Sequence, residues 1–279
     1  MEIMTSLGGG TPPVCRLGLA TRGNTHLDPD DVLHAVSRGV TYLNWCGRPD
    51  GLSRAVAEMD SDQTSRVVVA WQMKASGGDA AIRELDAALL ELNRSWIDVV
   101  TFYYVESDSE WTSIAAADGA LAAMQRAREE GKVRLIGMTS HQRKMAARIA
   151  AGELGPDERP LDLLMLRYNA AHRGAEADVF PVTDPMDLPV VVYTCLRWGA
   201  LMESTPEDPP GSKPPPAKEW YRFALAHPSV AVALAAPDGK EELEHDLSLL
   251  DDWRPPSLGE MEMLKAHGDR VYRNAGGFP

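Results

Sequence analysis

Residues 120–138 read ALAAMQRAREEGKVRLIGM, a helix-like segment followed directly by a strand-like one. Gly131 stands where the helical pattern stops, and glycine is the residue that most often ends a helix. The following VRLIGM is almost continuously apolar, which is typical of a parallel strand covered on both faces. The stretch therefore predicts one helix-to-strand unit of a parallel α/β fold.

The same alternation extends over the rest of the chain. Eight strand-like runs are expected, each followed by a helix-like run, at 15–20, 41–46, 66–72, 97–103, 133–138, 161–168, 189–194 and 230–235. Among the helices, 79–94 has the clearest apolar stripe, and Asp28 and Asp79 are expected to cap helices at their N-termini. Eight such units predict a single-domain (β/α)8 TIM barrel over residues 1–279.

Three segments depart from this regular pattern. Residues 1–13 contain GGG and are expected to form a flexible leader. Residues 203–216, ESTPEDPPGSKPPP, form a Pro-rich loop that is either a lid over the barrel mouth or a surface excursion. Residues 255–279 add one more helix and a tail, expected to be disordered or packed on the outside.

Composition excludes several classes of function. The formal net charge is −13, which disfavours nucleic acid or an anionic membrane as a partner. No apolar run is long enough to span a bilayer, and the three separated cysteines indicate neither a metal site nor a disulfide framework. We expect a cytoplasmic protein with a small-molecule ligand, and the sequence names no protein partner.

Side chains at the carboxyl ends of the expected strands are candidates for a binding site, because barrel enzymes bind their ligands there. Candidates for substrate binding are Trp45, Arg48, Gln72, Arg167 and Trp198. Cys46, Trp71, Tyr104 and Glu106 lie in the same zone. Each has a structural alternative: a strand tryptophan packs under helices about as often as it faces a pocket, and Arg48 with Asp50 could form a loop ion pair.

The order of several segments resembles the aldo-keto reductases, NADPH-dependent barrel enzymes that reduce carbonyl groups. The segments are LGLATRG (17–23), GVTYLNWC (39–46), RSWIDVVTFYYVESD (94–108), GKVRLIGMTSH (131–141), RYNAAHR (167–173), VVVYTCLRWGAL (190–201) and LAHPSVAVALAAPDGKEELEHDL (225–247). The resemblance covers nearly the whole chain. It implies the same barrel fold and a nicotinamide cofactor site.

The resemblance also implies a catalytic Asp, Tyr, Lys and His, and all four are replaced here. Asn44 stands for the Asp, Pro49 or Asp50 for the Tyr, Gln72 for the Lys and Tyr103 for the His. A neutral amide cannot lower a phenol pKa as an ammonium group does. The family mechanism is therefore not expected in this chain.

The resemblance places part of a cofactor site. Ser140 and Asn169 match family positions, and Tyr193 stands where an aromatic ring stacks on nicotinamide. The family's carboxamide-binding Asn and Gln correspond to His141 and Met165. Asp238 stands where a cation would hold the 2′-phosphate, and it repels phosphate unless Lys240 compensates, so binding of NADP or NAD is expected to be weakened.

Three functions stay open from the sequence. The first is a repurposed enzyme acting on a small organic substrate, with Tyr103, Lys74, Asp50 and His141 as acid and base. In it, Lys74 or Arg167 lowers the pKa of the Tyr103 phenol, and Tyr104 faces the opposite side. The second is a divergent NAD(P)H-dependent oxidoreductase that keeps the Tyr193 stack. The third is a non-catalytic pseudoenzyme that binds a partner.

Overall fold

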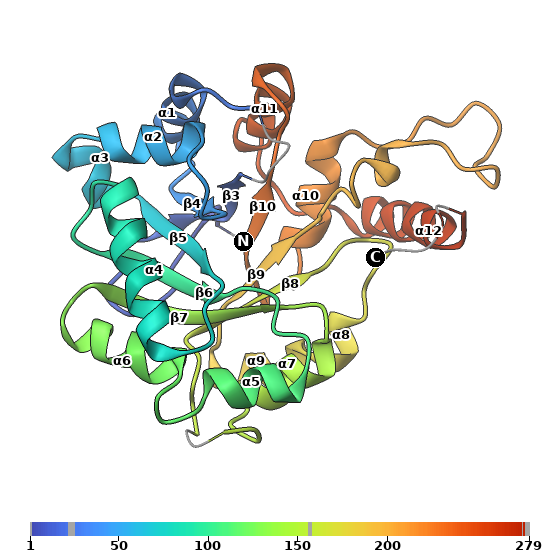
Figure 1. Ribbon diagram of the computed structural model, residues 1–279. Helices are drawn as coiled ribbons and strands as arrows, with labels where there is room; N and C mark the ends of the chain where they lie inside the picture. Colours follow the sequence, from blue (N-terminus) through green and yellow to red (C-terminus); the bar gives the residue numbers. More distant parts are fainter. Residues whose placement is uncertain (1, 22–25, 156–157, 275, 277–279) are drawn as a thin grey trace.

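A computed structural model describes residues 2–21, 26–155, 158–274 and 276. Eight parallel strands close into one barrel in the order β10-β3-β4-β5-β6-β7-β8-β9 (Figure 1). The strands are β3 (Leu17–Ala20), β4 (Tyr42–Trp45), β5 (Val68–Met73), β6 (Ile97–Phe102), β7 (Val133–Ser140), β8 (Leu163–Arg167), β9 (Val190–Tyr193) and β10 (Val230–Ala235). All eight predicted strands are confirmed, and so is the barrel.

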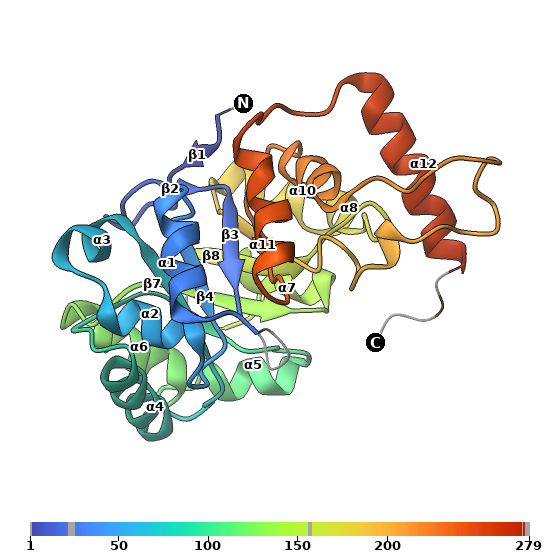
Figure 2. The ribbon, with the colours of Figure 1, turned by 90° about the horizontal axis from the view of Figure 1, so that it is seen from above.

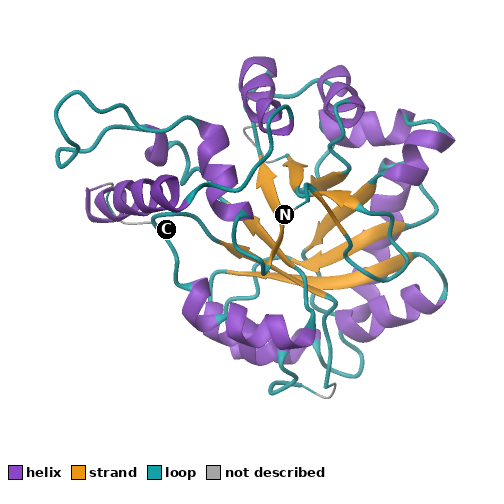
Figure 3. Cartoon of the chain, turned by 180° about the vertical axis from the view of Figure 1, so that it is seen from behind, coloured by secondary structure: helices purple, strands orange, loops and turns teal. Residues whose placement is uncertain are grey.

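Helices surround the barrel, and at least one follows each of the eight strands (Figure 3). They are α1 (Pro29–Ser37), α2 (Gly51–Glu58), α3 (Ser61–Arg66), α4 (Gly78–Glu91), α5 (Asp108–Ile114), α6 (Ala120–Glu129), α7 (Arg143–Ala150), α8 (Ala175–Asp178), α9 (Phe180–Thr183), α10 (Ala217–Leu225), α11 (Lys240–Leu247) and α12 (Leu258–Asn274). Short 3-10 turns are η1 (Asp184–Met186), η2 (Ala200–Met202) and η3 (Ser248–Leu250).

Two apolar layers hold the barrel together, one inside the strands and one between the strands and the helices. Tyr42 and Met165 belong to the inner layer, whereas Trp45 and Trp71 belong to the outer layer. Successive side chains of a strand point to opposite faces, so Asn44, between Leu43 and Trp45, shares the inner face with Tyr42. This alternation decides which side chains at the strand ends can face a ligand.

Two of the three expected helix ends are confirmed. Asp28 is the N-cap of α1, and its backbone N–H donates to the Asp31 carboxylate at 3.2 Å. Gly131 follows the end of α6 with a φ of 76°, the left-handed backbone that glycine adopts freely. The expectation for Asp79 is wrong: Gly77 caps α4, and Asp79 lies inside its first turn, where a carboxylate still favours the helix dipole.

The N-terminal segment is structured, which corrects the expectation of a flexible leader over 1–13. β1 (Met4–Thr5) pairs with β2 (Val14–Cys15) as an antiparallel hairpin, seen beyond one end of the barrel in Figure 2. Leu7 is buried in the inner apolar layer at the amino ends of the strands. Burial of this one side chain gives the Gly-rich turn a fixed position; residue 1 lies outside the described residues.

The Pro-rich loop 203–216 is a surface excursion that projects from the barrel beside α12 (Figures 1 and 2). Asp208 fixes its start, because its carboxylate accepts from Arg270 Nε at 2.6 Å and lies 3.2 Å from His267 Nδ1. The additional helix predicted in 255–279 is confirmed as α12, whereas 275 and 277–279 lie outside the described residues. Within the residues described, no helix is long and apolar enough to span a membrane.

Candidate functional site

Two buried amides lie at the carboxyl end of the barrel. Asn44 is 1% exposed, and its Oδ1 finds no hydrogen-bond partner among the described residues. Gln72 is also buried, and its Nε2 lies 3.9 Å from Met165 Sδ. Tyr103 follows β6 at the rim and is 39% exposed. Asn44 and Gln72 thus form a neutral polar floor below the rim.

The residues of the loop after β4 have structural roles. Asp50 is the N-cap of α2: its Oδ1 accepts from Ser53 N at 2.9 Å, and Ser53 Oγ accepts from Asp50 N at 3.0 Å. Trp45 points outward into the buried layer under the helices and donates from Nε1 to the Arg48 carbonyl at 2.7 Å. Trp45 therefore does not line the mouth, which corrects its expected place in the substrate site.

Lys74 and Tyr103 are close, but the expected lowering of the phenol pKa is absent. Lys74 Nζ lies 5.7 Å from the centre of the Tyr103 ring. Burial raises the pKa of Tyr103, Cys46 adds to the rise, and Arg48 opposes it. The Tyr103 phenol is therefore a hydrogen-bond donor at neutral pH and not a ready source of phenolate.

Tyr104 is brought into the mouth by its backbone, contrary to the expectation that it faces away from Tyr103. Its φ is 46°, and this left-handed conformation interrupts the strand alternation. The Tyr104 ring centre lies 4.2 Å from that of Tyr103, 4.4 Å from that of His141 and 6.2 Å from that of Tyr193. The ring centres of His141 and Tyr193 are themselves 5.9 Å apart, so the three rings form one cluster at the mouth.

His141 is held by Glu106, across 35 residues of sequence. Glu106 Oε1 accepts from the His141 backbone N–H at 2.8 Å and lies 3.2 Å from His141 Nδ1. Both side chains are about one-third exposed, with relative areas of 31% and 30%. Burial lowers the pKa of His141, Glu106 opposes this and Arg167 adds to it. A neutral imidazole with one nitrogen fixed by a carboxylate is the arrangement of a general base.

The three residues expected to bind the cofactor make hydrogen bonds within the protein. Ser140 Oγ donates to the Val105 carbonyl at 2.7 Å and accepts from Gln142 N at 2.9 Å. Asn169 is fully buried and bonds backbone groups through both ends of its amide. The Tyr193 hydroxyl donates to the Ser140 carbonyl at 3.3 Å. These side chains therefore fix the backbone conformation at the ends of the strands.

Arginines gather at the ends of β8 and β9. Arg167 is the last residue of β8 and pairs in register with Tyr193, the last residue of β9. Arg197 and Trp198 follow in a turn with left-handed φ values of 49° and 54°, and Trp198 is 56% exposed at the surface. Arg143, at the start of α7, pairs with Asp178 at 3.0 Å. We refer to Arg143, Arg167 and Arg197 as the basic side of the mouth.

The last strand-to-helix loop is acidic. Asp238 Oδ1 accepts from His26 N at 3.2 Å and lies 2.5 Å from His26 Nδ1. Glu242 Oε2 accepts from the Asp238 backbone N–H at 2.8 Å, so a side chain of α11 itself satisfies this amide. We refer to His26, Asp238 and Glu242 as the acidic side of the mouth.

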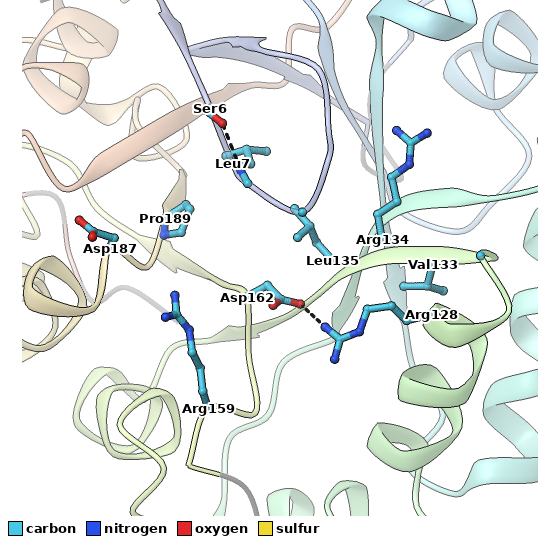
Figure 4. A pocket seen from close by; sticks show the side chains of 13 residues that line it. Ser6, Leu7, Arg128, Val133, Arg134, Leu135, Arg159, Asp162, Asp187 and Pro189 are labelled. Carbon is cyan, nitrogen blue, oxygen red and sulfur yellow. Dashed lines mark hydrogen bonds and ion pairs between the residues drawn. The ribbon is translucent and has the colours of Figure 1, made fainter.

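A separate hollow of about 620 Å³ lies at the amino ends of the strands, beside the β1–β2 hairpin (Figure 4). Its charged lining is paired: Asp162 Oδ2 accepts from Arg128 Nη1 and from Ile136 N, both at 2.9 Å. Barrel enzymes place their chemistry at the opposite end, so this hollow is not the candidate site. Among the described residues no group of three or more His, Cys, Asp or Glu is arranged to hold a metal ion.

The chain resembles known proteins in sequence and in fold. A model of the aldo/keto reductase family matches residues 30–250. A Klebsiella pneumoniae aldo-keto reductase in complex with NADPH superposes with a TM-score of 0.75 at 20% identity over 96% of each chain. A Bacillus halodurans aldo-keto reductase, in its holo form, gives 0.73 at 16% identity over 96% of each chain.

A second Klebsiella pneumoniae structure, with NADP and acetate, gives a TM-score of 0.75 at 19% identity over 92% of each chain. A direct comparison with curated protein sequences finds no match. The family match spans well over half of the residues and includes seven of the eight barrel strands. The chain therefore belongs to the aldo/keto reductase family.

Proposed function

We propose that this chain is a small-molecule enzyme that catalyses proton transfer on a carbonyl compound, with His141 as the base. The observation that carries the proposal is the His141–Glu106 pair at the carboxyl end of the barrel. Glu106 engages Nδ1, which leaves Nε2 as the ring nitrogen for the substrate. The lowered pKa of His141 keeps the ring neutral, as a base must be before it accepts a proton.

Tyr103 and Tyr104 are the proposed donors to the substrate oxygen. Burial raises the pKa of both phenols, that of Tyr104 to about 12, so both keep their protons at neutral pH. A phenol that donates a hydrogen bond to a carbonyl oxygen stabilises the enolate that forms when the base removes the adjacent proton. Lys74 and Asp50 are given no part in this step, because Lys74 does not lower the pKa of the Tyr103 phenol and Asp50 caps a helix.

NADP(H), which related structures contain, fits this mouth poorly. The Tyr104 ring packs beside those of His141 and Tyr193, the side chains that would meet the nicotinamide. Asp238 and Glu242 present carboxylates where a 2′-phosphate would be held. Arg167, Gln72 and Trp198 remain as the side chains of the mouth that we propose for substrate contact, with Arg48 at the rim. The proposed reaction therefore needs no hydride.

Exchange of carbon-bound hydrogen tests the proposal. Small ketones, aldehydes and oxo acids are incubated with the protein in D2O without cofactor, and NMR follows deuterium uptake beside the carbonyl. We expect uptake that falls at least 100-fold in His141→Gln, the range that one general base contributes. Arg83→Gln, an exposed change on α4, is the control and leaves the rate unchanged.

Two outcomes would contradict the proposal. One is exchange that His141→Gln does not reduce. The other is oxidation of NADPH or NADH, followed at 340 nm with the same carbonyl compounds, that survives His141→Gln, since it would identify a divergent oxidoreductase. Absence of both exchange and cofactor oxidation across the panel, with an intact fold, would favour a pseudoenzyme.

A further inference from the structure

Asn169 joins the ends of β8 and β9 from inside the mouth. Its Oδ1 accepts from Ala171 N at 3.0 Å and from His172 N at 2.9 Å, which closes the turn after β8. Its Nδ2 donates to the Thr194 carbonyl at 2.9 Å, and the same carbonyl accepts from Arg197 N at 2.9 Å. The buried Asn169 amide therefore fixes the positions of His172 and of the turn at Arg197. Both are fixed relative to Arg167, which precedes Asn169 by two residues.

Strand alternation directs Arg167 toward the interior of the mouth. Leu163 and Met165 of the same strand belong to the inner apolar layer, and Arg167 continues that face. Ser140 of β7 and Leu166 of β8 are register partners, so His141 and Arg167, which follow them, lie next to each other at the strand ends. The guanidinium of Arg167 is thus on the substrate side of the barrel.

Arg197 already holds one oxygen ligand. It is 5% exposed, and its Nη2 donates to the Gly276 carbonyl at 3.0 Å. Arg143 lies behind the turn, where its guanidinium occupies the space that a Cβ at Gly174 would take. Two arginines thus lie at the ends of neighbouring strands, with a third behind them.

Three arginines act on His172 in a chain whose formal net charge is −13. One of them, Arg143, is paired with Asp178. Burial and these arginines lower the pKa of His172 to about 4, so its ring adds no positive charge of its own at neutral pH. A cleft lined by charge of one sign attracts ligands of the opposite sign.

We propose that Arg167 and Arg197 bind an acidic group, a carboxylate or a phosphate, of the substrate on which His141 acts. The assignment rests on the proposed function, and it names the substrate class as small carbonyl compounds that carry such a group. Planar guanidinium groups match the oxygens of carboxylates and phosphates in paired hydrogen bonds. An oxygen of the ligand takes the place of the Gly276 carbonyl on Arg197.

Binding of simple anions to the full chain tests the assignment independently of turnover. Inorganic phosphate and malonate are titrated separately, and ¹H–¹⁵N NMR follows the arginine Nε–H signals. We expect both to shift the Arg167 and Arg197 signals with millimolar or tighter affinity. Arg167→Gln and Arg197→Gln should each weaken binding at least tenfold, the range of a charge-assisted hydrogen bond.

Matched variants distinguish a guanidinium site from general attraction between an anion and a positive charge. Arg167→Lys keeps the positive charge and loses the planar guanidinium group. Its affinity for the anion should therefore lie between those of the wild type and Arg167→Gln. Arg83→Gln removes one positive charge from an outer helix and should bind as wild type. His141→Gln should lose hydrogen exchange and keep anion binding, so failure of the base assignment and failure of the anion site give different results.

Unchanged affinity in Arg167→Gln, or no saturable shift with either anion, would overturn the assignment. A second result would also overturn it: Arg167→Gln and Arg197→Gln weaken the binding of NADPH, while malonate shifts neither arginine signal of the wild-type protein. The anion held there would then be the cofactor's diphosphate and not a substrate group.

Discussion

The basic and acidic sides of the mouth belong to the same ring of strand ends, but they are built differently. On the basic side, fully buried Asn169 fixes the turns that carry the charges. On the acidic side, His26 and Asp238 have side-chain exposures of 79% and 53%. A charge on a fixed, partly desolvated frame interacts more strongly than a charge in water. On the proposed function, the basic side binds the acidic group of the substrate and the acidic side repels anions.

Removal of the buried amide is expected to have the largest effect on this comparison. Asn169→Ala leaves the buried Ala171 N–H without its acceptor and removes the donor to the Thr194 carbonyl, which should destabilise the fold by about 3 kcal/mol and abolish malonate binding. Urea unfolding and the NMR titration measure the two effects. Asn169→Asp keeps the acceptor and should lose less stability. Full malonate affinity in Asn169→Ala would show that the basic side does not depend on this frame.

Reversal of charge on the acidic side should have a moderate effect. Asp238→Lys removes the carboxylate that faces a 2′-phosphate, so NADPH affinity should rise about fivefold relative to NADH, an amount limited by solvent screening. Titration of both cofactors by tryptophan fluorescence measures the ratio. Glu129→Lys makes the same charge change at the end of α6, and it should leave the ratio unchanged. An unchanged ratio in Asp238→Lys would mean that the acidic side does not discriminate between NADPH and NADH.

The smallest effect concerns the proposed base, His141, which follows β7 next to the basic side. Glu106 raises the pKa of His141 against burial, so Glu106→Gln should lower that pKa further. Because the neutral ring is the base, the acid limb of the exchange rate should move to lower pH. Histidine ¹⁵N shifts recorded against pH give the pKa, and Glu129→Gln, which removes a carboxylate at the end of α6, is the control. A pKa that rises in Glu106→Gln would contradict the pairing.

The sequence predicts the barrel because the signal is repeated along the chain. Each apolar run, such as VRLIGM at 133–138, is long enough to be recognised as a strand. The predicted helix end at Gly131 agrees with the end of α6 in the structure. The segment 1–13 gives no such signal. A single buried side chain, Leu7, fixes a Gly-rich segment that composition alone describes as flexible.

The candidate site is less predictable, since it depends on side-chain direction and on long-range contacts. The inward position of Asn44 implies that Trp45 points outward, so strand alternation alone is enough to place Trp45 correctly. The left-handed backbone at Tyr104 has no comparable sequence signal. The sequence marks Glu106 only as one of several residues at the mouth. It does not reveal that Glu106 pairs with His141, which lies at the end of the next strand.

The last helix has a consequence for the order of assembly. Gly268 of α12 packs directly on Ala170, next to the buried amide of Asn169, and Asp269 pairs with Arg173 at 2.7 Å. The Tyr272 ring meets the His172 ring edge-on at 5.6 Å. During synthesis the eight strands emerge before this helix does, so the turn after β8 completes its contacts only when the end of the chain has docked. The proposed anion site is therefore complete only after α12 has docked.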